Sequence, residues 1–285
     1  MISNCNLQQV PFSKYSGSGN DFILIDNRKN IFPKTDKNFI QQLCRRSLGI
    51  GADGIILLET SVHANYRMRI YNADGGEAEM CGNGLRCLAR FIQELKIPGN
   101  TFLIEVSNAH YKVSAREHGI TVEMPPPSLL NWDVLVNYQE QSICLDYLDT
   151  GVPHVVSFVD DVEAIELEKI GPYLRHNTRF APKGANVNFA SRMNANTFCI
   201  RTYERGVEGE TLACGTGATA VAVAAERKFH LTGPIIILTR SKEKIEFTIT
   251  KQCDKITEIT MQGPAKKIYS GVFETEKLLN ATPLS

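Results

Sequence analysis

A short segment with the pattern Cys-Gly-x-Gly occurs twice in this sequence, each time at the start of an apolar stretch of helical length. The first copy is EMCGNGLRCLARF, with its cysteine at Cys81, and the second is LACGTGATAVAVA, with its cysteine at Cys214. The cysteines are 133 residues apart (214 − 81 = 133), and Glu77 and Glu210 keep the same spacing (210 − 77 = 133). The repeat predicts two similar folding units, each built around one of these segments.

Both segments are apolar around most of their circumference, which is typical of a helix buried on most sides rather than of a surface helix. We therefore expect each to run through the middle of a curved sheet. The apolar positions are Leu85, Cys87, Leu88, Ala89, Phe91, Ile92 and Leu95 in the first copy, and Ala218, Ala220, Val221, Ala222, Val223, Ala224 and Ala225 in the second.

Short apolar or alternating runs elsewhere predict strands, because they are bounded by turn residues. In the first half they cover 22–26, 54–59, 66–71 and 102–106, and in the second half 144–148, 154–159, 197–203, 234–238, 244–249 and 255–261. Two outer helices are expected, one over 36–48 with Gly49 as its C-cap and one over 162–174. The predicted fold class is α/β (α+β), with two pseudo-symmetric domains, each a mainly antiparallel curved sheet around a central helix.

A run of three prolines lies near the middle of the chain, in MPPPSLL at 124–130. Because proline has no backbone donor, this run continues neither a helix nor a central strand. It places the domain boundary after residue 124, giving a first domain of 1–124 and a second of 125–263. The residues from 274 to 285 are interpreted as a tail.

Charge and length exclude several classes of partner. The 31 basic and 31 acidic residues leave no net field to hold nucleic acid or an anionic membrane, which favours a small-molecule ligand. The start of the sequence, MISNCNLQQVPF, lacks the features of a signal peptide, and no stretch approaches about 18 apolar residues. We expect a cytoplasmic protein.

The eight cysteines do not form a metal motif. No pair has the spacing Cys-x-x-Cys, and Cys81 and Cys87 lie too far apart along a helix to bind one zinc ion from the same face. We therefore expect reduced thiols and no metal site, and we assign no function to six of them: Cys5, Cys44, Cys87, Cys144, Cys199 and Cys253.

A cysteine at the start of a helix combines two chemical properties. The first turn leaves about four backbone N–H groups without intrahelical partners and carries about half a positive elementary charge, so it attracts carboxylates and phosphates. The same charge favours the thiolate of a cysteine, whose ordinary pKa is about 8.5. If both copies met one ligand carbon, one thiolate could remove a proton and the opposite thiol could return one, which inverts a stereocentre without a cofactor.

Five longer motifs carry a resemblance that covers nearly the whole chain: SGSGNDF (16–22), GIGADG (49–54), YNADGGEAEMCGNG (71–84), GANVNF (184–189) and YERGVEGETLACGTG (203–217). With them the sequence resembles the diaminopimelate epimerase family, whose cofactor-independent, two-cysteine fold is shared with proline racemase. The resemblance implies conversion of LL-diaminopimelate to meso-diaminopimelate, a step in lysine and peptidoglycan precursor synthesis. It also implies that the last strand, about 264–273, returns to the first domain, and that the chain can form a homodimer.

The resemblance also implies roles for individual residues. The catalytic positions are Cys81, Cys214, His154 and Glu204. The reacting carboxylate would be held by the backbone amides of Gly82, Asn83, Gly215 and Thr216. The distal amino-acid end of the substrate would bind Asn20, Asn72, Asn186, Glu204 and Arg205, since a guanidinium suits a second carboxylate and a carboxylate suits an ammonium group.

One position departs from the family pattern. The family usually has Gly-Asn-Pro-His where this chain has Gly151, Val152, Pro153 and His154. An aliphatic group thus replaces a side-chain amide near the distal carboxylate, at a cost of about 0.5–1.5 kcal/mol for one neutral hydrogen bond. We hypothesise that distal recognition is looser and admits other acidic amino acids such as glutamate.

Other interpretations remain open at this point. Another amino-acid racemase of the same fold would share every motif, and a non-enzymatic binding module would need only one helix start. GIGADG and GTGATA also match the letters of a dinucleotide-binding motif, which leaves a nucleotide-binding oxidoreductase as an alternative. However, GIGADG follows a helix, and GTGATA has neither a predicted strand directly before it nor an acidic strand end about 20 residues later. Taken alone, the asparagines could be turn residues, His154 a buried structural residue, and Glu204 and Arg205 a solvated pair.

Overall fold

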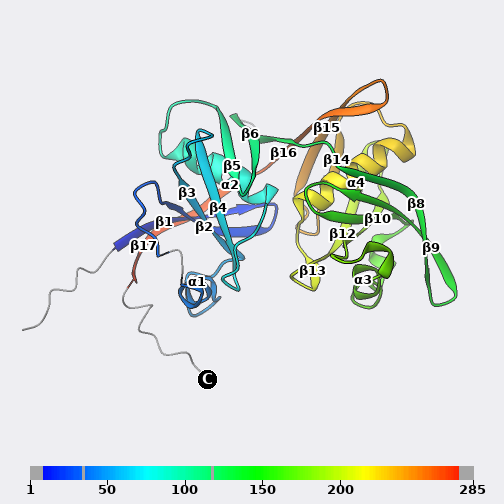
Figure 1. Ribbon diagram of the computed structural model, residues 1–285, viewed down its shortest axis with the longest axis horizontal. Coiled ribbons are helices and arrows are strands. Elements are labelled where there is room, and N and C mark those ends of the chain that lie inside the picture. The colour runs from blue at the N-terminus through cyan, green and yellow to red at the C-terminus, as the bar shows by residue number, and fades with distance from the viewer. Residues whose placement is uncertain (1–8, 34–35, 117–118, 276–285) are drawn as a thin grey trace, which may run out of the picture. The chain divides into compact units, whose positions relative to one another are not determined.

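The computed structural model describes residues 9–33, 36–116 and 119–275. The chain divides into two compact units (Figure 1). Unit 1 contains the chain up to Arg116 together with the part from Ala265, and unit 2 runs from Glu117 to Pro264. Each unit contains a mainly antiparallel sheet, one outer helix and one central helix, so the predicted fold class is confirmed.

Unit 1 begins and ends with strands that pair with each other, because β17 lies antiparallel to β1. The chain's last described strand thus belongs to unit 1. Its elements are β1 (Gln9–Gly17), β2 (Asn20–Asp26), α1 (Lys37–Cys44), β3 (Gly54–Glu59), β4 (Tyr66–Asn72), α2 (Gly82–Glu94), β5 (Thr101–Val106), β6 (Ala109–Arg116) and β17 (Lys266–Glu274).

Unit 2 repeats the succession of strands and two helices around its own central helix α4, and it has additional strands and two 3₁₀ helices. Its elements are β7 (Gly119–Met124), β8 (Leu129–Tyr138), β9 (Gln141–Asp149), β10 (Pro153–Phe158), η1 (Val162–Ala164), α3 (Leu167–Arg175), η2 (Thr178–Phe180), β11 (Asn186–Arg192), β12 (Thr197–Glu204), β13 (Gly209–Thr211), α4 (Gly215–Phe229), β14 (Ile235–Leu238), β15 (Lys244–Gln252) and β16 (Lys255–Gly263).

The strand pairings repeat between the units. In unit 1 the pairs β2–β3, β3–β4, β4–β5 and β5–β6 are parallel, antiparallel, parallel and antiparallel. Unit 2 has the same alternation of parallel and antiparallel pairing in the pairs β10–β11, β11–β12, β12–β14 and β14–β15. Ile55 faces Tyr71 in one unit and Val187 faces Tyr203 in the other, an offset of 132 (187 − 55 = 203 − 71 = 132). The offset becomes 133 at the cysteines because the turn before Cys214 is one residue longer.

Each sheet is covered on both faces by helices, which explains strands that are apolar on both sides. In unit 1 the side chains of Ile55 and Leu57 pack with α1, while Ile56 points to the opposite face and lies against α2. In unit 2 Val187 and Phe189 pack with α3. Figure 1 shows α2 among the strands of unit 1 and α4 among those of unit 2, and both helices are buried along most of their length, as predicted.

Two helix predictions were wrong in their bounds. Helix α1 ends at Cys44 because Arg45 is extended, so Gly49 is not its C-cap. A side chain at Gly49 would lie 2.0 Å from the carbonyl oxygen of Gln42, so glycine is needed where the chain folds back on α1. The helix expected over 162–174 is split into η1 and α3. Arg201 donates to the carbonyl oxygens of Val162 and Ile165 at 3.1 and 2.9 Å, so these carbonyl groups do not accept the hydrogen bonds of a continuous helix.

The predicted domain boundary also differs from the division of the structure. The prolines separate β7 from β8, as expected of residues without a backbone donor. However, β7 pairs antiparallel with β16, so it belongs to unit 2, and the division lies at Arg116 rather than after residue 124. Composition marks a break in a strand but not the strand's partner. Most of the predicted tail, from 276 onward, lies outside the described residues.

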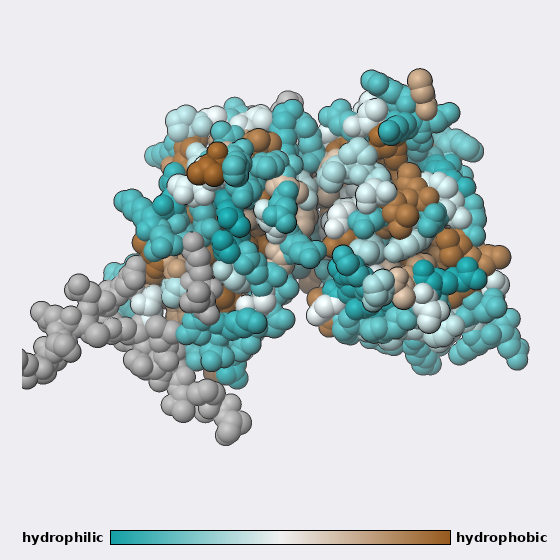
Figure 2. Space-filling view, in the orientation of Figure 1, coloured by the Kyte–Doolittle hydropathy of each residue, from teal (hydrophilic) through white to brown (hydrophobic). Residues whose placement is uncertain are grey.

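The face drawn in Figure 2 is mainly hydrophilic, with apolar side chains in separate small patches. Among the described residues, no helix has both the length and the hydropathy needed to span a membrane.

Candidate active site

Cys81 is the N-cap residue of helix α2. Its backbone is extended (φ −150°, ψ 110°), and its sulfur accepts a hydrogen bond from the backbone N–H of Gly84 at 3.3 Å. Serine, threonine, aspartate and asparagine are the usual residues at such a position. Because any of these would cap the helix at least as well, the capping role alone does not explain a cysteine there.

Cys214 is the N-cap residue of α4 and is also extended (φ −124°, ψ 112°). Its sulfur does not accept a capping hydrogen bond from the helix backbone; it lies 3.4 Å from the hydroxyl oxygen of Thr216 instead. The residue is 7% exposed, whereas Cys81 is only partly buried. The two cysteines therefore have the same place in the fold but different surroundings.

In unit 1 a chain of polar side chains leads away from the start of α2. The amide of Asn83 donates to the Oδ1 atom of Asn20 at 2.6 Å, and the amide of Asn20 donates to Asp53 at 3.3 Å. Arg86 is fully buried, and it donates to Asn83 at 2.8 Å and to Ser18 at 2.7 Å. The structure thus brings the predicted residues Asn20 and Asn83 together, and it adds a buried cation that the sequence interpretation did not include.

In unit 2 the corresponding chain is neutral. The Nε2 atom of His154 lies 2.9 Å from the hydroxyl oxygen of Thr216, and its Nδ1 atom lies 3.2 Å from the amide nitrogen of Asn188. Thr202 donates to the Oδ1 atom of Asn188 at 3.0 Å. Burial, together with the positive charge of Arg205, lowers the pKa of His154 to about 3, so the imidazole is neutral near pH 7.

The residues predicted for the distal end of the substrate lie at the ends of strands. Asn186 is buried; its amide donates to the carbonyl oxygen of Pro153 at 3.0 Å, and its Oδ1 atom accepts from the backbone of Arg205 at 2.8 Å. Asn186 therefore fixes the backbone next to Glu204, which ends β12. Asn72 ends β4 in unit 1 and is exposed.

The second glycine of each repeat lies where the central helix meets its own sheet. A side chain at Gly84 would come within 2.8 Å of Ile56, and one at Gly217 within 2.4 Å of Asn188. These glycines let each helix approach its own sheet. Gly82 and Gly215 are the first residues of α2 and α4, where backbone N–H groups lack intrahelical partners.

Sequence interpretation gave no role to the repeated glutamates, and the structure shows one. Glu77 accepts two hydrogen bonds from Arg69 at 3.0 and 2.9 Å, and Glu210 accepts two from Arg201, both at 2.8 Å. Each pair ties the segment before a cysteine to the preceding strand. The signal was present in the sequence, since both halves have an arginine two positions before the tyrosine that begins the motif.

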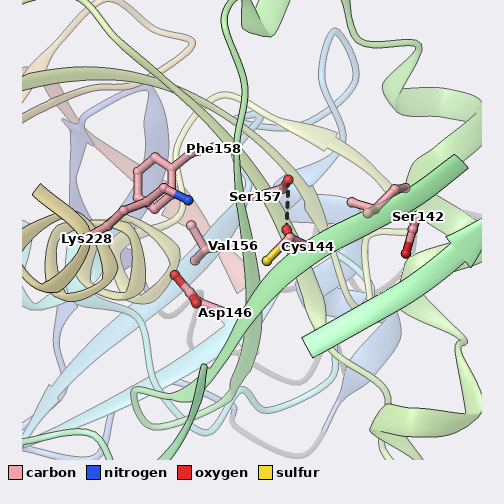
Figure 3. Close-up of a pocket in the computed structure, with 8 residues that line it drawn as sticks. Ser142, Cys144, Asp146, Val156, Ser157, Phe158 and Lys228 are labelled. Carbon is pink, nitrogen blue, oxygen red and sulfur yellow. Dashed lines mark hydrogen bonds between the residues drawn. The ribbon is translucent and has the colours of Figure 1, made fainter. Parts of the chain in front are cut away.

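A cavity of about 250 Å³ lies elsewhere in unit 2, between β9, β10 and α4 (Figure 3). It is lined by Cys144, Asp146, Ser157 and Lys228, and Ser157 donates to the carbonyl oxygen of Cys144 at 3.2 Å. None of the predicted site residues lines it, so we assign it no role. Within the described part of the chain, no group of three or more His, Cys, Asp or Glu residues could hold a metal ion.

The two glycine motifs do not have the surroundings of a dinucleotide-binding site. GIGADG lies between α1 and β3, which is the reverse of the required order. GTGATA does follow a strand, the short β13, so the expectation of none before it was wrong. However, β13 pairs antiparallel with β12, and the next strand, β14, ends at Leu238 without an acidic residue.

Comparison with known proteins extends the likeness from motifs to the whole chain. The family model described as diaminopimelate epimerase matches residues 12–130 and 147–268. A diaminopimelate epimerase from Flavobacterium psychrophilum is 39% identical over 259 residues, which are 90% of this chain and 97% of that relative.

Solved structures agree on the fold. A phenazine biosynthesis protein from Bacillus anthracis has a TM-score of 0.73 at 13% identity, covering 94% of this chain and 99% of its own. A hydroxyproline epimerase from Agrobacterium vitis has a TM-score of 0.71 at 13% identity, covering 93% and 92%. At 13% identity these structures show only that the fold is shared. Membership of a family is shown by the family model, which matches most of the sequence. The chain therefore belongs to the diaminopimelate epimerase family of isomerases.

Proposed function

We propose that the protein converts LL-diaminopimelate to meso-diaminopimelate by inverting one α-carbon without a cofactor. The observation that carries the proposal is the placement of a cysteine at the N-cap of a buried central helix in each of two repeated units. A binding module would need one such helix start, whereas inversion needs an acid and a base. The product would serve lysine and peptidoglycan precursor synthesis.

The helix starts supply the binding site for the reacting carboxylate. Backbone amides of Gly82 and Asn83 in one unit, and of Gly215 and Thr216 in the other, belong to the first turns, where N–H groups lack intrahelical acceptors. When the α-proton leaves, negative charge spreads onto this carboxylate. Amides that are already oriented stabilise the charge as it develops.

The cysteines exchange protons with the two faces of the α-carbon. In one direction the Cys81 thiolate takes the α-proton and becomes a thiol, while the Cys214 thiol gives its proton to the opposite face and becomes a thiolate. In the other direction the roles reverse. One C–H bond breaks and one forms, no electrons are transferred, and the overall charge is unchanged, so the step requires no redox cofactor.

The distal amino-acid end of the substrate would bind Glu204 and Arg205 at the end of β12. A guanidinium can hold a carboxylate with two parallel hydrogen bonds, and a carboxylate can hold an ammonium group. Asn186 supports this site from beneath through its hydrogen bond to the backbone of Arg205. We propose that Asn20 and Asn72 contribute from unit 1.

The test is incorporation of deuterium at the α-carbon of LL-diaminopimelate in D₂O, with purified protein and no added cofactor. Mass spectrometry and chiral chromatography would follow label and configuration together. We expect the meso product to carry deuterium from the first turnover, because the returning proton comes from a thiol that exchanges with solvent. A protein that neither exchanges nor isomerises the substrate would contradict the proposal.

We further propose that the site accepts other acidic amino acids. Val152 directly precedes β10 and corresponds in the repeat to Asn20 (152 − 20 = 132), so unit 2 has an aliphatic side chain where unit 1 has an amide. We expect racemisation of glutamate by the natural protein and a lower kcat/KM for glutamate, relative to diaminopimelate, in Val152→Asn. Val152→Leu is the matched control. No measurable rate on glutamate would refute this proposal alone.

A further inference from the structure

We propose that Asn188 is a positioning residue that keeps the proton of His154 on Nε2, so that the hydroxyl hydrogen of Thr216 points to the sulfur of Cys214. The role of Asn188 in turnover rests on the proposed function. The directions of the hydrogen bonds from Asn188 to Cys214 do not depend on that function, because all of these contacts lie within unit 2.

The orientation of the Asn188 amide is fixed from two sides. Its nitrogen lies 2.9 Å from the carbonyl oxygen of Val155, which can only accept, and its oxygen lies 3.0 Å from the hydroxyl of Thr202. Turning the amide would place two acceptors, its own oxygen and that of Val155, against each other. The nitrogen of Asn188 therefore faces the Nδ1 atom of His154 as a donor.

This donor decides the tautomer of the histidine. Nδ1 of His154 must accept, so in the neutral ring the proton lies on Nε2 and is donated to the hydroxyl oxygen of Thr216. That oxygen is then an acceptor from His154, and its own hydrogen is available to the Cys214 sulfur, 3.4 Å away. The side chain of Asn188 thus acts on the sulfur through two others, without touching it.

The repeat shows that the fold itself does not require these polar residues. The positions of His154, Asn188 and Thr202 correspond in unit 1 to Phe22, Ile56 and Ile70 (154 − 22 = 188 − 56 = 202 − 70 = 132). Both Ile56 with Ile70 and Asn188 with Thr202 are cross-strand pairs beneath the central helix. The same place in the sheet is an apolar core in one unit and a hydrogen-bonded chain in the other.

Because the polar side chains of this chain in unit 2 are buried, they destabilise the fold unless each of them has a hydrogen-bond partner. His154 and Asn188 are completely buried, and Thr202 is 2% exposed. A buried polar group without a partner is destabilising, while an apolar side chain of similar size is not. Since unit 1 is built with apolar residues here, we infer that the chain in unit 2 serves the cysteine at its end.

The first arm of the experiment reads the tautomer directly. In protein labelled with ¹⁵N-histidine, two-dimensional NMR near neutral pH distinguishes protonated from unprotonated ring nitrogens, and His154→Gln identifies the signals of His154 among the six histidines. We expect Nε2 to be protonated and Nδ1 unprotonated in the natural protein. In Asn188→Asp, whose carboxylate accepts only, we expect Nδ1 to become protonated. A natural protein protonated on Nδ1 would overturn the proposal, even if the variant does not fold.

The second arm of the experiment measures how readily Cys214 forms a thiolate. Iodoacetamide alkylation across a pH series, followed by peptide mass spectrometry, gives a rate for Cys214 and, in the same molecules, for Cys81 as an internal reference. In Thr216→Val we expect Cys214 to react about tenfold more slowly near neutral pH, equal to a rise of about one unit in its titration midpoint. Thr216→Ser retains the hydroxyl and should stay within about twofold of the natural protein.

Thr219→Val is the matched control, because Thr219 is also buried in α4 but donates to the carbonyl oxygen of Gly215 at 2.9 Å. We expect no change at Cys214 in this variant. Equal rates in Thr216→Val and the natural protein would refute the proposal. Alkylation does not depend on turnover, so a protein with the expected tautomer and rates but no epimerisation would refute the proposed function and leave this inference intact.

Discussion

Helices α2 and α4 begin at equivalent positions in the two units, but the buried polar side chains near them come from different elements. In unit 1 the strands beneath the helix are apolar, with Ile56 against Gly84, and the buried polar groups are Asn83 and Arg86 on the helix itself. In unit 2 the strands carry the polar chain, and Thr219 occupies the helix position of Arg86 (219 − 86 = 133).

This difference separates what the repeat must keep from what it can change. Both units keep the cysteine at the N-cap, the glycine that lets the helix approach the sheet, and the arginine–glutamate pair before the cysteine. Those features set where the helix begins. The side chains below the helix only have to fill a volume and satisfy their polar atoms, so each unit could adopt a different set.

The largest effect is expected from removal of either sulfur. Cys81→Ala and Cys214→Ala should each lower the rate of epimerisation by about 10³-fold or more, since an inversion needs both an acid and a base. Chiral chromatography of diaminopimelate would measure it, and unchanged circular dichroism would show that the fold is intact. Normal turnover by either variant would mean that the two helix starts are not equivalent partners in the reaction.

Alanine at the buried glycines should affect unit 2 more than unit 1. A side chain at Gly217 would meet the fixed amide of Asn188 at 2.4 Å, while one at Gly84 would meet the end of the flexible Ile56 at 2.8 Å. We expect Gly217→Ala to lower the free energy of unfolding by about 3 kcal/mol and Gly84→Ala by about 1 kcal/mol or less, because alanine also favours the helix. Urea unfolding would measure both, and similar losses would contradict the asymmetry.

Acid should weaken unit 2 through His154. The unfolded chain protonates this histidine below its ordinary pKa of 6.5, whereas the folded chain does so only near 3. Between these values the unfolded state binds one more proton, so the free energy of unfolding falls by about 1.4 kcal/mol for each pH unit as pH decreases. Above 6.5 the effect is absent.

The variant His154→Gln removes the contribution of His154 to the pH dependence of the free energy of unfolding. Between about pH 6.5 and about pH 5, its free energy of unfolding should fall by about 2 kcal/mol less than that of the natural protein. Trp132, the single tryptophan, lies in unit 2, so its fluorescence would report the unfolding of unit 2 in urea. Parallel pH profiles for the two proteins would show that His154 is not held neutral.

The smallest effect is expected at the repeated ion pairs. Glu210 and Arg201 have side chains that are 19% and 11% exposed, and those of Glu77 and Arg69 are 44% and 21% exposed. Glu210→Gln should therefore lower the free energy of unfolding by about 1–2 kcal/mol and Glu77→Gln by about 0.5 kcal/mol or less, as solvent screens the outer pair. A larger loss from Glu77→Gln would reverse this comparison.

Much of the fold was predictable because it depends on local patterns. The repeat of Cys81 and Cys214, the apolar circumference of the two helices and the strand periodicity led to two units with central helices. The errors have tertiary causes. Arg201 binds the carbonyl groups of Val162 and Ile165 where a continuous helix was expected, and β7 joins unit 2 because its partner is β16.

The sequence by itself determined the family, the two cysteines and the residues expected around them, because these are matters of residue type and spacing along the chain. Only the tertiary structure decided what each polar side chain contacts. Asn188 lies two residues after Asn186 and no spacing rule distinguishes them, yet one orients a histidine and the other holds the backbone of Arg205. Hydrogen bonds depend on distances of a fraction of an ångström between strands far apart in sequence, and those distances are set by packing.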